Sequence, residues 1–168
     1  NRILGADWVV TQTGAPIEKG VVVVEGAKIA WVGREADLPS QFTGQAVDRF
    51  AGVLTPGLVN AHTHLQYTGF AALGKRQFTS FEHWADEFEV EYLAVTGPDE
   101  WTRAAAQGVK LAINCGTTSL AEIITNDAAR GALAAHSAGG IEYLEVISEI
   151  DRSWAEGGRD AFLQRLAA

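Results

Sequence analysis

The 168-residue chain contains no methionine, a single cysteine and four prolines, and basic residues are scarce in it. Because Cys115 has no second cysteine to pair with, an internal disulfide is excluded, and a reducing, cytoplasmic compartment is expected. The 13 Lys and Arg residues are outnumbered by 21 Asp and Glu residues, which gives a formal net charge of −8. This balance argues against binding to nucleic-acid phosphates or to anionic membranes.

Long apolar runs are also lacking. None approaches the length of a membrane span, and no basic segment followed by an apolar one opens the chain as in a secretory signal. Hydrophobic residues nevertheless make up 47% of the sequence, enough for a substantial core in which Cys115 is expected as a small buried hydrophobe. The start at Asn1 without methionine and the uncapped helical pattern at the end lead us to expect the front part of a longer protein.

Residues 1–53 are predicted to form β-structure. The apolar runs 21–25 and 28–33 are separated by a two-residue link that begins with Gly26, a pattern typical of a β-hairpin. The polar stretch 34–49 is expected to be a linker that holds a short turn.

After residue 53 the pattern changes to alternating strands and helices. Strands are predicted over 54–64, 117–123 and 141–147. Helices are predicted to begin near Ser80, where Thr79 and Glu82 have capping-box spacing, at Pro98, near Asn126 and near Arg159. This alternation indicates an α/β fold with βαβ units and a parallel sheet over residues 54–168.

The most informative segment is LTPGLVNAHTHL, in which an apolar run ends in His62 and His64. Residues two apart on a β-strand project to the same face, whereas Thr63 faces the other way. Both imidazoles can therefore point into one cavity, where neutral histidine is a common ligand for zinc and similar metals. The other histidines, His83 and His136, are expected at the surface or at helix ends.

This segment resembles the first barrel strand of the amidohydrolase superfamily, which carries PG-x-[VI]-[ND]-x-H-x-H. The resemblance implies an N-terminal β-sandwich segment over 1–53 and the first three βα units of a (β/α)8 TIM-type barrel over 54–168. It also implies a divalent metal held by His62 and His64, with zinc expected and iron as the alternative. The remaining ligands and the general acid and base would follow residue 168, so catalytic residues stay unassigned and these residues alone are expected to be inactive.

The stretches NAHTHLQYTGFAALG and SFEHW look most like the aminohydrolase branch of that superfamily. This resemblance implies a hydrolase that deaminates an aromatic heterocycle by metal-activated hydroxide, with an adenosine derivative or aminodeoxyfutalosine as substrate. Hydrolysis of a cyclic amide C–N bond, as in imidazolonepropionase, is the alternative within enzymes. A non-catalytic interaction module that keeps the fold is the alternative outside them.

Five polar residues are candidates for binding a small heterocyclic substrate. Gln66 follows the metal strand and offers donors and acceptors to a heterocycle edge. Glu122 lies at the end of the strand predicted over 117–123 and Glu145 within the strand predicted over 141–147, and an acid in an apolar strand is costly unless it is paired. Glu89 and Glu91 follow SFEHW, which resembles the SFEEW segment that in adenosine-type deaminases precedes an acid that binds ribose hydroxyls. A homo-oligomer is compatible with the sequence.

Overall fold

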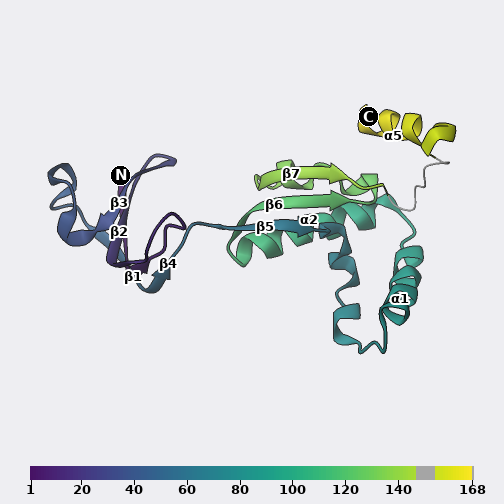
Figure 1. Ribbon diagram of the computed structural model, residues 1–168, viewed down its shortest axis with the longest axis horizontal. Coiled ribbons are helices and arrows are strands. Elements are labelled where there is room, and N and C mark those ends of the chain that lie inside the picture. The colour runs from purple at the N-terminus through teal and green to yellow at the C-terminus, as the bar shows by residue number, and fades with distance from the viewer. Residues whose placement is uncertain (147–153, 168) are drawn as a thin grey trace. The chain divides into compact units, whose positions relative to one another are not determined.

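The computed structural model describes residues 1–146 and 154–167, which fall into two compact units, Asn1–Pro56 and Gly57–Ala168 (Figure 1). Within the described residues, no helix is both long enough and apolar enough to cross a membrane. The interpretation of residues 1–53 as a β-sandwich segment and of 54–168 as three βα units stays a prediction.

The first unit is a four-stranded sheet with the strand order β3-β2-β1-β4. Its strands are β1 (Arg2–Val9), β2 (Ile17–Glu25), β3 (Lys28–Arg34) and β4 (Val47–Leu54). The predicted hairpin is confirmed, because β2 and β3 pair antiparallel and Gly26 takes a positive φ of 59° in the turn. The linker prediction for 34–49 is wrong at its end: two 3-10 turns (Glu35–Asp37 and Ser40–Phe42) lead into β4, which pairs parallel with β1 from Val47 onward.

The valine run of β2 is buried on both faces of this sheet. Val21 and Val23 pack on one face with Ile3 and Phe42, whereas Val22 packs on the other face with residues of β1. Successive residues of a strand point to opposite faces, so an unbroken apolar run serves two cores.

The second unit contains a parallel three-stranded sheet with the order β5-β6-β7. The strands are β5 (Leu58–Thr63), β6 (Thr117–Ile124) and β7 (Gly139–Leu144). The helices are α1 (Phe81–Ala94), α2 (Pro98–Asn114), α3 (Ala132–Ala135) and α5 (Arg159–Ala167), and shorter turns include η3 (Leu65–Phe70), η4 (Leu73–Lys75), η5 (Asp127–Ala129) and η6 (Trp154–Gly158). The predicted alternation is confirmed, although Leu54 ends β4 rather than beginning β5, and residue 147 lies outside the described residues.

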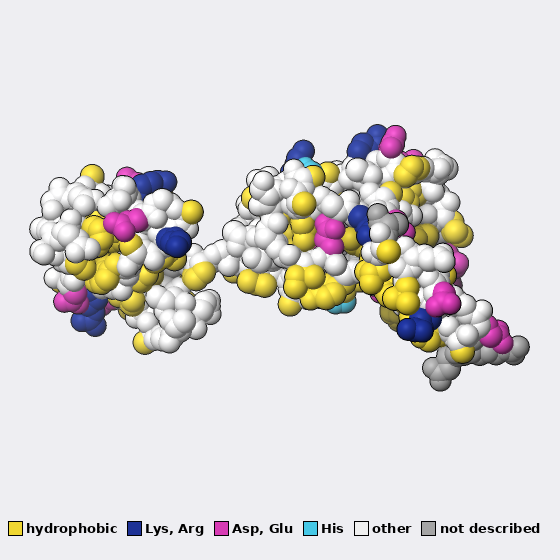
Figure 2. All heavy atoms as spheres, turned by 90° about the horizontal axis from the view of Figure 1, so that it is seen from above, with side chains coloured by type: hydrophobic (Ala, Val, Ile, Leu, Met, Phe, Trp, Pro, Cys, Tyr) yellow, Lys and Arg dark blue, Asp and Glu magenta, His cyan; other side chains and the backbone are white. Residues whose placement is uncertain are grey.

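One face of this sheet is covered by α2. Leu120 and Ile124 of β6 are almost fully buried and pack with Ala105 and Val109 of α2. The opposite face carries exposed apolar side chains of β7, among them Ile141 and Tyr143, and Figure 2 shows hydrophobic side chains at the surface of this unit. Cys115, expected to be buried, is exposed, because it follows the last residue of α2 at the open end of that helix.

The start of α1 gives a prediction on stability. Ser80 is the N-cap, and its Oγ accepts a hydrogen bond from the His83 N–H at 3.2 Å, so the cap lies one residue after the expected Thr79. We expect Ser80→Ala to lower the free energy of unfolding by about 1 kcal/mol, because it leaves a helix N–H without its partner. Urea unfolding of the intact protein measures this. Thr79→Ala is the matched control, and an equal or larger loss in that variant would contradict the assignment of the cap.

Candidate metal-binding site

The two histidines of the sequence motif lie on the same side of the chain at the end of β5. Their ring centroids are 5.3 Å apart, and the rings meet edge to face. Gly57 begins the approach to this strand, and a Cβ at that position would lie 2.2 Å from Thr118 Oγ1 of β6, so only glycine allows the two strands to come together here.

A bulge in β5 decides which face of the sheet the histidines take. Asn60 pairs with Leu120, but Thr63 pairs with Glu122, so β5 uses three residues where β6 uses two. Without the extra residue, His62 would be the partner of Glu122 and would share its face toward α2. The Asn60 side chain accepts a hydrogen bond from the His62 backbone N–H at 3.1 Å, which supplies that group with a local partner at the irregularity.

A 3-10 turn then stacks aromatic rings on His64. Because a 3-10 helix has about three residues per turn, side chains at i and i+3 lie above one another. In η3 this aligns His64, Tyr67 and Phe70: the His64 and Tyr67 centroids are 4.9 Å apart with nearly parallel planes, and those of Tyr67 and Phe70 are 5.6 Å apart. Sequence reasoning missed Tyr67, although its spacing of three from His64 was a usable signal.

Three consecutive residues after His64 are tied to the end of β6. The Leu65 backbone N–H donates to both carboxylate oxygens of Glu122, at 2.9 Å each. Gln66 Nε2 donates to the Ile123 carbonyl at 3.0 Å and to Thr125 Oγ1 at 2.6 Å, and the Tyr67 hydroxyl shares a hydrogen bond of 2.7 Å with Thr125. These contacts hold the turn η3 against β6.

Glu122 lies on the sheet face that is opposite to the histidines. It shares this face with Leu120 and Ile124 and is completely buried. Burial raises the pKa of its carboxyl group to about 7; the Leu65 hydrogen bond acts against this rise, and the charge of Glu142 adds to it. The contact that the structure provides for Glu122 is thus with the backbone of η3, and its expected role in substrate binding stays a prediction.

Glu145, in contrast, is on the side of His64. It follows β7, and its Oε2 lies 4.0 Å from His64 Nδ1. Both atoms are buried and have no hydrogen-bond partner among the described residues. Burial is also the main cause that raises the pKa of the neighbouring Tyr67; the Thr125 hydrogen bond acts in the opposite direction, and the charge of Glu145 adds to the rise.

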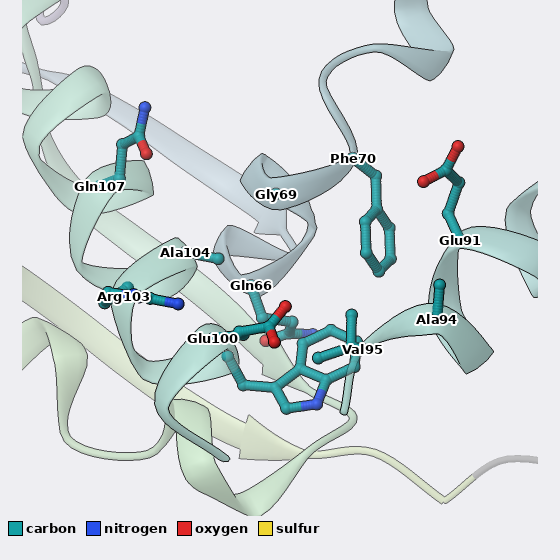
Figure 3. Close-up of a pocket in the computed structure, with 11 residues that line it drawn as sticks. Gln66, Gly69, Phe70, Glu91, Ala94, Val95, Glu100, Arg103, Ala104 and Gln107 are labelled. Carbon is teal, nitrogen blue, oxygen red and sulfur yellow. The ribbon is translucent and has the colours of Figure 1, made fainter. Parts of the chain in front are cut away.

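Gln66 and Glu91 line a cavity of about 320 Å³ between η3, α1 and α2 (Figure 3). The buried Gln66 Oε1 has no hydrogen-bond partner among the described residues. Phe70 reaches into this cavity, whereas Glu91 is bound by Arg76 at 2.7 Å. The structure therefore brings Gln66 and Glu91 together and Glu145 to His64, while Glu89 is exposed on α1 and belongs to neither group.

The residues present fit half of a metal site. In the part of the chain that the structure describes, no group of three or more His, Cys, Asp or Glu side chains could enclose a metal ion. Two imidazoles on one side of a strand end are nevertheless the type of ligand that zinc takes. In addition, the buried Nδ1 of His64 has no hydrogen-bond partner among the described residues, which is uncommon for a buried polar atom.

The family of this chain follows from comparison with known proteins. The model of the amidohydrolase family matches residues 53–147, which is more than half of the chain and includes all the residues of the candidate site described above. The chain therefore belongs to the amidohydrolase family.

Individual relatives agree with this assignment. Imidazolonepropionase of Erwinia tasmaniensis is 35% identical over 147 residues, which cover 86% of this chain and 32% of the relative. The structure of Helicobacter pylori aminofutalosine deaminase in complex with methylthio-coformycin is 20% identical with a TM-score of 0.72, over 95% of this chain and 39% of that one. Adenosine deaminase of Xanthomonas campestris with bound zinc is 24% identical with a TM-score of 0.62, over 84% and 33% of the two chains.

The chain thus spans about a third of the length of the relatives that it matches. The structural similarities confirm the expected fold class, an α/β chain with an N-terminal β-unit and the first part of a (β/α)8 barrel. In such barrels the functional groups lie at the carboxyl ends of the strands, which is where β5 places His62 and His64.

Proposed function

We propose that the protein is a metal-dependent hydrolase that cleaves a C–N bond of a nitrogen heterocycle. The observation that supports this most directly is the pair of imidazoles on one side of the end of β5 in a chain of the amidohydrolase family. His62 and His64 would hold a divalent cation, with zinc favoured by the donor type. When it is bound, such a cation lowers the pKa of water to about 7 and so supplies a nucleophile at neutral pH.

The residues of this chain would then bind and orient the substrate. Gln66, whose buried amide oxygen has no hydrogen-bond partner among the described residues, and Glu91, a carboxylate held by Arg76, line one cavity beside the aromatic rings of η3; neither His62 nor His64 lines this cavity. Acceptors of this kind suit the N–H groups of a heterocycle. For Glu89 and Glu122 the proposal of a substrate contact rests on the sequence alone, since neither lines this cavity.

Two reactions fit this chemistry, and we place hydrolytic ring opening of a cyclic amide first. Relatives with the name imidazolonepropionase reach 35% identity over 147 residues and 47% over 51 residues. Deamination of a purine-like nucleoside comes second, because the similarity to deaminase structures lies at 20–24% identity and concerns the fold. In both reactions water attacks a trigonal carbon that is bonded to nitrogen.

A product assay on the zinc-loaded intact protein separates the two reactions. Ring opening of imidazolone propionate removes the ultraviolet absorbance of the ring and releases no ammonia, because the nitrogen stays bonded to the product. Deamination of adenosine or of an aminofutalosine releases ammonia and leaves the ring in place. We expect the first outcome; ammonia from a purine substrate without ring opening of the imidazolone would replace it with the second. Turnover of neither class would favour a non-catalytic interaction module.

A further inference from the structure

The imidazole of His64 is restrained on two sides by groups that do not belong to the metal-binding motif. Tyr67 covers one face of the ring, and Glu145 faces its Nδ1 edge. Since a histidine ligand binds a metal through one nitrogen only, whatever fixes the ring and its proton also fixes which nitrogen is offered.

The restraint on the ring face comes from a side chain that is itself anchored. The periodicity of η3 sets Tyr67 over His64, and its hydroxyl is held by Thr125 Oγ1 at 2.7 Å. Thr125 in turn receives the hydrogen bond of the fully buried Gln66. Phe88 of α1 packs edge-on against the Tyr67 ring with centroids 4.8 Å apart. Rotation of Tyr67 away from His64 would break these contacts, so the Tyr67 ring is held in place against the imidazole.

The restraint on the ring edge comes from two unpartnered buried atoms that lie close to one another. Glu145 Oε2 and His64 Nδ1 are buried, have no hydrogen-bond partner among the described residues, and are 4.0 Å apart. A neutral imidazole carries its proton on one nitrogen and a lone pair on the other. A carboxylate 4.0 Å from Nδ1 favours the tautomer with the proton on Nδ1, because the negative charge attracts the partial positive charge of the N–H. The lone pair is left on Nε2.

We propose that Tyr67 and Glu145 are positioning residues that orient His64 and present its Nε2 to the metal. The inference rests on the proposed metal site. In this proposal the Glu145 carboxylate interacts with His64 and not with the substrate. Tyr67 acts on His64 through its aromatic ring, which stacks on the imidazole.

The test measures zinc affinity of the intact protein, freed of metal by chelation and titrated with Zn²⁺ against a chromophoric chelator. Glu145→Ala and Tyr67→Leu are each expected to weaken zinc binding by about 10- to 100-fold, the usual effect of losing an outer partner of a ligand. Glu145→Gln keeps an acceptor and should lose less than Glu145→Ala. Tyr67→Phe keeps the stacked ring but loses the hydrogen bond to Thr125, so it should lose much less zinc affinity than Tyr67→Leu.

Tyr92→Leu is the matched control, because Tyr92 belongs to the same aromatic cluster, packs on Trp101 at 5.0 Å, and has no ring contact with His64 among the described residues. Zinc affinity that is unchanged in Glu145→Ala and Tyr67→Leu, or that falls equally in Tyr92→Leu, would overturn the inference. Should Tyr67→Leu not fold, the graded pair Glu145→Gln and Glu145→Ala decides the question. His64→Ala separates a failure of the proposed metal site from a failure of the positioning role. If this variant binds zinc as the wild type does, the assignment of the metal site itself is wrong.

Discussion

Replacing His64 by alanine is expected to remove most of the bound metal and with it the activity. The substitution takes away one of the two ligands that this chain contributes and leaves His62 as a single imidazole at the end of β5. Without the cation, the pKa of water returns to its much higher ordinary value, and several kcal/mol of transition-state stabilisation are lost, which corresponds to a rate decrease of about a thousandfold or more. Metal analysis of the purified protein and turnover on the assigned substrate measure the two effects, and His62→Ala should behave alike.

The matched control is His136→Ala. His136 lies at the end of α3, and its Nδ1 is 3.0 Å from the Ala132 carbonyl oxygen, so its loss should leave metal content and turnover unchanged. Wild-type metal content in both His62→Ala and His64→Ala would mean that the cation, if present, is held by other groups. In that case the family membership would stand, but the site and the proposed reaction would not.

The histidine pair and the order of elements were accessible from the sequence because both depend on local patterns. Alternation along a strand predicts that His62 and His64 share a side, and turn residues such as Gly26 mark a hairpin wherever they occur. The fold class and the relationship to amidohydrolases follow from such patterns together with the motif around residues 54–65.

The face of the sheet on which each acid lies was not accessible in this way. Glu122 and Glu145 were both expected near the substrate, but strand parity places Glu122 toward α2 and Glu145 toward His64. The face on which the two histidines lie depends on the bulge between Asn60 and Thr63, and this bulge is visible only in the pairing with β6. The register between β5 and β6 depends on contacts between segments about 60 residues apart. The periodicity within one strand carries no information about such contacts.

Glu122 provides the second large expected effect, a dependence of stability on pH. Its pKa is raised from 4.5 to about 7 by burial, so between these values the folded chain binds more protons than the unfolded chain. Stability from this group is therefore complete below pH 4.5 and falls as the pH rises through 7. Between pH 5 and 8 we expect the wild type to lose about 2–3 kcal/mol relative to Glu122→Gln, in which nothing titrates at this position. Urea unfolding of the intact protein at both values measures the difference.

Comparison with the variant is essential, because histidines also change charge between pH 5 and 8 and their contribution cancels only in the difference. Glu89→Gln, on the exposed side of α1, removes a carboxylate without removing a buried one and should follow the wild type. If Glu122→Gln and the wild type ran parallel across this range, Glu122 would have to be charged at pH 5 in the folded protein, with more support than the single Leu65 N–H gives it. The turn behind His64 would then be held by an ionised carboxylate throughout, and removing that charge would destabilise the protein equally at both pH values.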